Sequence, residues 1–315
     1  MKTLTQRITL KSNNHYGTRL PPEATGRALM KIAHAVQSAI SMALRGRSRA
    51  RGPAPAWLSA AADIRFVGHE GEGDSVLCFE APRLGAAASE VYDQGLLWDI
   101  RPDKDDTGLD LLADVIDDVA GGKEDSARFD HSLLRSIAGF KSVLNGEFQE
   151  IVFHTRRYEA PRYLSLNPNT ISSAERLFSA TPVPQRVRVI GLLDMIRVST
   201  QSFALRLDEG QETRGVLVTG QIVEARDLLE KRVLVLGKAV YRPSGSLLRI
   251  DAESISLTTA ESSLWSRVPT PTGKTLDVAS LRKPQGPRSG VAAIIGQWPG
   301  QESDEEIREM LEEIS

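Results

Sequence analysis

The feature that most constrains this chain is a series of short apolar–polar alternations within residues 186–258. Residues 186–190 alternate polar and apolar side chains, which is typical of a half-buried strand, and this strand is expected to continue to Ile196. The next run places Phe203, Leu205 and Leu207 on one face. These patterns have the period of strands, so this region is expected to form a β-structure with its own core.

The order of elements narrows the architecture further. A third strand carries Val216 and Val218 in phase, a helix is expected at 221–229, and two strands follow at 233–241 and 247–257. An open sheet of five strands would leave two unpaired edges. The order of three strands, a helix and two strands therefore predicts a closed five-stranded barrel.

The segments VRVIGLLDMI and KRVLVLGKAVYRPSGSLLRIDAESI resemble OB-fold domains in this order of elements. The resemblance covers residues 186–258 and implies a ligand face on the second and third strands. Single-strand binders place stacking aromatics among basic residues there. This sequence offers Arg206 and Arg214, with Arg242 nearby, but Phe203 is in phase with the core. A structural or protein-binding barrel is therefore favoured over a nucleic-acid-binding one.

The region before the barrel mixes strands and helices without strict alternation, which indicates an α+β fold. Strands are expected at 4–10, 64–67, 75–79, 150–155 and 162–166, and helices at 22–44, 106–120, 130–144 and 172–178. The predicted organisation is a mixed α+β domain at 1–182, an OB-like barrel at 186–258, a Pro/Gly-rich linker at 259–300 and an acidic amphipathic helix at 301–315.

Composition and motifs exclude several function classes. The net charge of −2 provides no bulk attraction to nucleic acid or anionic lipid. The single cysteine, Cys78, excludes a disulfide within the chain and a CxxC metal site. No apolar run has the length of a signal peptide core or a membrane helix, so a cytoplasmic protein without membrane contact is expected. No phosphate loop, dinucleotide fingerprint, metal motif or catalytic motif is present, so no cofactor, metal or catalytic residue is predicted.

An alternating basic run follows the first predicted helix. It consists of Arg45, Arg47, Arg49 and Arg51 in a segment rich in glycine and proline. In a loop, such a run is a candidate strip for phosphate contacts, and together with the barrel arginines it forms the alternative nucleic-acid-binding hypothesis. It also fits a solvated connector between the helix and the hairpin, or a seat for the chain's own acidic tail.

The C-terminal tail carries the clearest local pattern. An apolar island in the linker includes Ile294, Ile295 and Trp298, and must be buried on the parent fold or on a partner. Ser303 and Glu306 have the spacing of a capping box. The helix that follows places one apolar stripe opposite an acidic face that includes Glu305 and Glu309; the stripe consists of Ile307, Met310, Leu311 and Ile314. A helix this short needs packing to be stable, in cis or in trans.

The string IIGQWPGQESDEEIREMLEEIS resembles the tails of bacterial type II antitoxins, which lie in the groove of a partner ribonuclease, commonly a PIN-domain toxin. The resemblance covers residues 294–315 and implies that the apolar and acidic residues named above bind such a toxin. The rest of the chain departs from that family, since it shows neither a DNA-binding ribbon nor a helix-turn-helix at its start. The sequence therefore favours a non-enzymatic, antitoxin-like interaction protein, with nucleic-acid binding as the alternative.

Overall fold

The computed structural model describes residues 3–50, 52–95, 97–144, 146–155, 162–208, 210–218 and 225–258, and the single residues Pro271, Ser303 and Glu305. Residues 1–275 belong to one compact unit and residues 276–315 to another. Within the first unit the elements follow in the order β1 (Thr3–Lys11), α1 (Pro22–Arg45), α2 (Ala56–Ala61), β2 (Arg65–Glu70), β3 (Ser75–Pro82), α3 (Leu84–Ala87), α4 (Ser89–Asp93), α5 (Gly108–Ala120), α6 (His131–Ala138), α7 (Lys141–Leu144), β4 (Glu150–Thr155), β5 (Arg162–Leu166), α8 (Pro168–Ala180), β6 (Gln185–Arg197), β7 (Ser202–Arg206), β8 (Glu212–Leu217), β9 (Arg232–Tyr241) and β10 (Leu247–Leu257).

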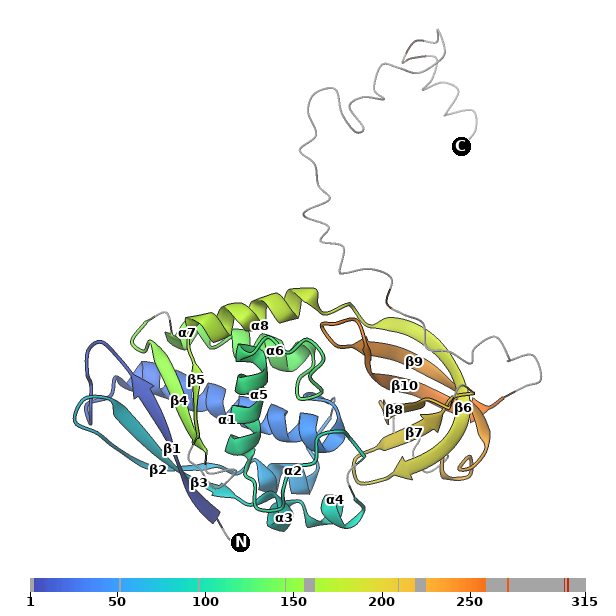
Figure 1. Cartoon of the computed structure of the whole chain (residues 1–315), viewed down its shortest axis with the longest axis horizontal. Helices are drawn as coiled ribbons and strands as arrows, with labels where there is room; N and C mark the ends of the chain where they lie inside the picture. Colours follow the sequence, from blue (N-terminus) through green and yellow to red (C-terminus); the bar gives the residue numbers. More distant parts are fainter. Residues whose placement is uncertain are drawn as a thin grey trace. The chain divides into compact units, whose positions relative to one another are not determined.

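The first five strands form one antiparallel sheet in the order β2-β3-β1-β4-β5. The helices lie against one side of this sheet, with α5 next to the strands and α1 packed on α5 (Figure 1). Ile8 and Leu10 of β1 join the helices in a continuous apolar core. The mixed α+β fold that the sequence predicts is confirmed.

Helix α1 begins and ends where its sequence requires. Pro22 occupies the first helical position, which suits the fixed φ of proline. Buried residues recur along one side of the helix, from Ala28 through Ile32 to Ile40. Gly46 ends it in the left-handed conformation, with φ of 69°, and donates its N–H to the Met42 carbonyl.

One expectation about the helices is wrong. The helix expected at 130–144 is divided into α6 and α7, because the chain turns at Gly139 and Phe140. The short helix α2 was not predicted. It follows Pro55 directly after the Pro/Gly-rich segment and buries Trp57 and Leu58.

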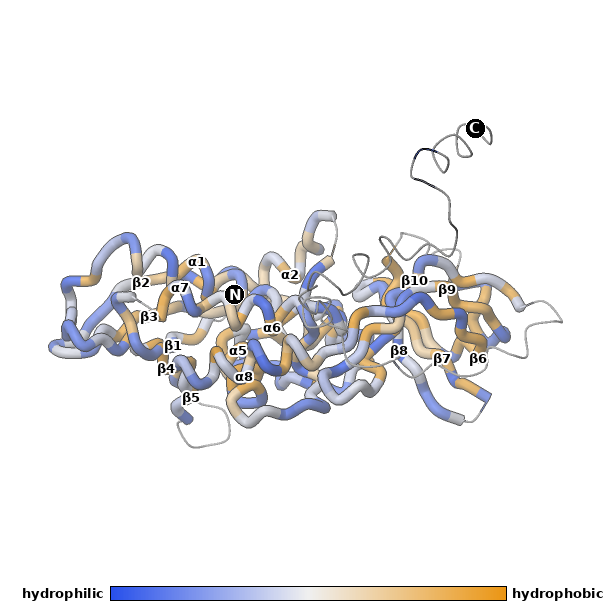
Figure 2. The backbone as a smooth tube through the Cα atoms, turned by 90° about the horizontal axis from the view of Figure 1, so that it is seen from above, coloured by the Kyte–Doolittle hydropathy of each residue, from blue (hydrophilic) through white to orange (hydrophobic). Residues whose placement is uncertain are grey.

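The second sheet is a closed barrel in the order β10-β8-β7-β6-β9, and β9 closes it by pairing with β10. The contact between β8 and β10 is parallel, and the other strand pairs are antiparallel. Figure 2 shows apolar stretches along the barrel strands. The predicted closed barrel is confirmed, and it is consistent with the OB type. Residues 221–224 of the helix predicted at 221–229 lie outside the described residues; of the rest, Ala225 and Arg226 are helical and residues 227–229 form a turn.

The structure decides which face of strand β8 enters the barrel core. Leu217 lies in the barrel core. Val216 points to the outside of the barrel, where the chain around Trp98 buries it, and Val218 is 42% exposed. The inner position next to Phe203 belongs to Gly215, where a Cβ atom would come within 2.3 Å of the Phe203 ring. The large ring of Phe203 therefore fills the space of a missing side chain, and this sets the phase of the strand.

The barrel is joined to the helices by a buried ion pair. Asp130, the N-cap of α6, accepts hydrogen bonds from the Ser48 N–H and hydroxyl. Arg249 of β10 places Nη1 3.3 Å from the Asp130 carboxylate and donates to the Gly46 carbonyl, while its Nε donates to Asp251. The Arg249 and Asp130 side chains are 7% and 5% exposed. One pair of charges therefore connects the barrel, the end of α1 and the start of α6.

Removing one member of this pair is expected to destabilise the fold strongly, because it leaves a buried charge without its partner. Arg249→Met and Asp130→Asn should each lower the free energy of unfolding by about 3–5 kcal/mol, measured by urea denaturation. The control is Arg232→Met, which breaks an exposed pair with Asp208 and should cost no more than about 1 kcal/mol. Equal effects of the buried and exposed substitutions would refute the central role of the pair.

The same pair predicts how stability depends on pH. Burial alone raises the pKa of Asp130, but the Arg249 charge and the hydrogen bonds from Ser48 and Leu133 outweigh it and lower the pKa below the ordinary 3.8. A carboxyl with a lowered folded pKa stabilises the fold above its unfolded pKa and loses that contribution as the pH falls through the folded value. The stability difference between the wild type and Asp130→Asn should thus be constant near neutral pH and shrink below about pH 4.

Candidate functional site

The outer face of β7 and β8 is the place where OB-type barrels commonly bind ligands. In this protein the face is covered by the segment that follows α4. Leu97 and Trp98 pack onto Ala204 of β7 and Val216 of β8, and all four are buried. The part of the barrel expected to be open to a ligand is therefore occupied by the protein's own chain.

Trp98 is positioned by the end of α1. A Cβ atom on Gly46 would come within 2.2 Å of the Trp98 ring, so the ring lies directly against the glycine backbone. Gly46 is also in the left-handed conformation, which a glycine adopts without strain. The same residue thus ends the helix and makes room for the aromatic side chain that covers the barrel.

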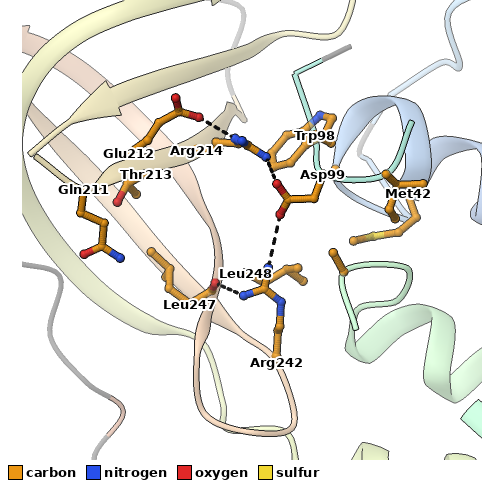
Figure 3. Close-up of a pocket in the computed structure, with 13 residues that line it drawn as sticks. Met42, Trp98, Asp99, Gln211, Glu212, Thr213, Arg214, Arg242, Leu247 and Leu248 are labelled. Carbon is orange, nitrogen blue, oxygen red and sulfur yellow. Dashed lines mark hydrogen bonds and ion pairs between the residues drawn. The ribbon is translucent and has the colours of Figure 1, made fainter. Parts of the chain in front are cut away.

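A small pocket of about 220 Å³ lies beside this cover (Figure 3). Asp99 stands between two barrel arginines: its carboxylate lies 2.5 Å from Nη1 of Arg214 and 3.8 Å from Nη2 of Arg242. Glu212 holds Nε of Arg214 at 2.8 Å. Arg242 also donates to the Leu247 carbonyl. Two carboxylates face two guanidinium groups, so the charges of this pocket are balanced within the chain.

The electrostatics agree with that pairing. Burial by itself lowers the pKa of Arg214, but the hydrogen bonds to Glu212 and Asp99 outweigh it and raise the pKa above its ordinary value. Arg214 and Arg242 were predicted as contacts to nucleic acid. The structure brings both arginines together, but they contact the Asp99 carboxylate of the same chain. Arg206 of β7, the third predicted barrel contact, is exposed.

The basic run after α1 does not form the solvated loop that was considered from the sequence. Arg45 is the last residue of α1, and both Arg45 and Arg47 are buried, 6% exposed each. Arg47 donates to the side chain of Gln201 at 3.1 Å. Arg49 is exposed, and Arg51 lies outside the described residues. The structure therefore brings Arg45 and Arg49 to the lining of one pocket, whereas Arg47 contacts Gln201, so the described arginines do not form one continuous exposed strip.

The residues predicted to bind a partner lie mostly outside the described part of the chain. Glu305 is described: it is helical and exposed. No position is described for the other eight, which are Ile294, Ile295, Trp298, Ile307, Glu309, Met310, Leu311 and Ile314. Their role in binding stays a prediction.

Other polar residues that were considered for catalysis or ligand binding make structural contacts in the described part of the chain. Asp110 closes a capping box with Thr107 at the start of α5. His154 of β4 shares a hydrogen bond of 2.8 Å with the Thr9 hydroxyl of β1. Among the described residues there is no group of three or more His, Cys, Asp or Glu side chains placed to hold a metal ion. None of the described helices is long and apolar enough to span a membrane.

The sequence reasoning missed Trp98 and Asp99. Both lie in an irregular segment between α4 and α5 that carries no periodic pattern. Their importance depends on contacts with residues more than a hundred positions away in the barrel, which no local spacing reveals. The one available signal was Trp98 itself, a large aromatic residue in a segment otherwise rich in charge.

The chain matches no protein-family model, no curated protein and no solved structure. The fold and the site together define a class: an α+β protein with a closed five-stranded barrel, whose β7–β8 face is covered by a segment of the same chain.

Filling the space between Gly46 and Trp98 is expected to displace the cover. Gly46→Ala should pay about 1 kcal/mol for the left-handed backbone, and about 1–3 kcal/mol more for the clash with the ring. Gly52→Ala is the matched control, since Gly52 also has a positive φ, 86°, but nothing within 4 Å of its Cβ position. Urea denaturation should show a larger loss for Gly46→Ala; equal losses would mean that Trp98 is not seated on the glycine.

Proposed function

We propose that this chain is a non-enzymatic, antitoxin-like interaction protein of the bacterial cytoplasm that binds a PIN-like toxin through residues 294–315. The observation that carries the proposal is the pattern of this tail: an apolar island, a capping box and one apolar stripe opposite an acidic face. A peptide of this kind gains stability only by burying its apolar stripe. Binding in a partner's groove supplies that burial, as amphipathic helices do in general.

The barrel supports this proposal because its β7–β8 face is not open to a ligand. Its β7–β8 face is covered by Leu97 and Trp98, and its nearby arginines are neutralised by Asp99 and Glu212. A nucleic acid would have to displace apolar contacts and two ion pairs to reach that face. The nucleic-acid alternative therefore finds less support than a binding function carried by another segment.

The charge of the tail suits the proposed partner. Its predicted helix has an acidic face, and Glu305 is exposed there. Ribonucleases must attract the phosphate backbone of RNA, so their binding grooves are positively charged. An acidic peptide of the right shape could block such a groove by occupying the place of the RNA.

The proposal predicts that the tail neutralises a PIN-domain ribonuclease encoded beside this chain. Co-expression of the full chain should restore growth and suppress RNA cleavage, whereas a variant lacking residues 291–315 should do neither. Ile307→Asp together with Leu311→Asp should also abolish protection, because charges on the stripe cannot be buried in a groove.

Arg308→Gln is the control for these changes, since it leaves the apolar stripe and the acidic face intact; it should protect like the wild type. Undiminished protection by the truncated chain would refute the role of the tail. The absence of any ribonuclease whose cleavage the chain suppresses would count against the proposed function as a whole.

A further inference from the structure

A second pocket lies at the C-terminal end of α1 and shares no lining residue with the Asp99 pocket. It has a volume of about 400 Å³, within the range of about 300–1,000 Å³ that small-molecule sites occupy. Its polar lining comes from one side of α1 and from the segment after it, and Leu58 of α2 contributes an apolar wall. The polar residues that matter here are Gln37, Arg45, Ser48 and Arg49.

Arg45 lines this pocket as a buried cation without a partner. The residue is 6% exposed, and its Nε is fully buried with no hydrogen-bond acceptor. Within the part of the chain that the structure describes, no carboxylate forms an ion pair with it. Burial and, to a smaller extent, the nearby charge of Arg47 together lower the pKa of Arg45 to about 10. The guanidinium is therefore desolvated, and no carboxylate of the described residues compensates for this.

Two acids that interact with the segment after α1, Asp130 and Asp251, are already engaged. Asp130 is bound by Ser48 and Arg249, and Asp251 is bound by Arg249. The Asp251 charge acts on Arg47, not on Arg45. The end of α1 favours a nearby cation through the helix dipole, but a dipole leaves the N–H donors of Arg45 without acceptors. Buried arginines are normally paired, so Arg45 is suited to contact an anionic ligand.

The two pockets differ in the sign of their charge. The Asp99 pocket holds two carboxylates against two arginines, whereas the pocket at the end of α1 is lined by Arg45 and Arg49 and by no acidic residue. Arg49 is exposed and its guanidinium has no partner among the described residues. Two arginines at one pocket favour a dianionic group such as phosphate over a single carboxylate, because both guanidinium groups can then contact negative charge. A guanidinium also matches phosphate oxygens with two parallel hydrogen bonds.

We propose that the pocket at the end of α1 binds a phosphate group, either as inorganic phosphate or on a small monoester, through Arg45 and Arg49. Arg45 provides the buried contact and Arg49 closes the pocket from the solvent side. The apolar wall at Leu58 leaves room for the organic part of a monoester. The site is independent of the proposed tail–toxin interaction, since none of its residues belongs to the tail.

The test is calorimetric titration of the full chain with inorganic phosphate and, separately, with adenosine monophosphate, each at constant ionic strength set with chloride. Saturable binding of either ligand supports the site. Tighter binding of the monoester identifies a small organic phosphate as the ligand; equal binding identifies the phosphate group alone. No binding of either at millimolar concentration overturns the proposal.

Arg45→Met removes the charge but retains most of the aliphatic stem, and should weaken binding at least about tenfold. Arg49→Met should weaken it by a smaller factor, since this side chain is exposed. Arg186→Met is the control, because Arg186 is an exposed arginine of β6 outside the pocket; it should bind like the wild type.

The thermal midpoint without ligand separates a binding role from a structural one. An unpaired buried charge opposes folding, so Arg45→Met should melt at or above the wild-type temperature. If Arg45→Met does not fold, Arg45→Lys and Arg49→Met carry the test, since lysine cannot form the two parallel hydrogen bonds. Wild-type affinity in both of these variants would overturn the assignment.

Discussion

The buried pair of Asp130 and Arg249 is the interaction on which the arrangement of this protein depends. Asp130 caps α6 and holds Ser48, so it fixes the turn that follows α1. Arg249 extends from β10 and reaches the carbonyl of Gly46 as well. A buried pair of charges tolerates little displacement, because separated charges lose the attraction that offsets the cost of removing them from water. The barrel is therefore held at the end of α1 in one specific position.

That position has consequences for function. With the barrel at the end of α1, Trp98 is enclosed between Gly46 and the β7–β8 face, and Asp99 meets Arg214 and Arg242. A face that is open in ligand-binding barrels of this type is thus an internal contact here. Arg45, at the end of the same helix, is buried and forms no ion pair with an acid of the described residues. One helix terminus thus contributes both to a pocket with balanced charges and to a pocket lined by arginines.

Local patterns were reliable wherever one periodicity decided the outcome. The alternation at 186–190 and 202–206 predicted β6 and β7, and the apolar spacing from Leu29 to Leu44 predicted α1. Local patterns left open which face of β8 enters the core, because the size of Phe203 opposite Gly215, a contact between strands, decides it. The prediction of one helix at 130–144 failed because the turn at Gly139 and Phe140 outweighs the continuity of the apolar pattern.

The sequence by itself determined the class of fold, the strands of the barrel and the amphipathic pattern of the tail, since each depends on neighbours within a few residues of one another. Only the tertiary structure decided which arginines are paired. Arg45 and Arg47 look alike in the sequence, and Arg214 and Arg242 look equally available. Their environments differ because Asp99, Gln201 and the end of α1 reach them from distant parts of the chain. Charge compensation depends on distance in space, and no spacing along the chain encodes it.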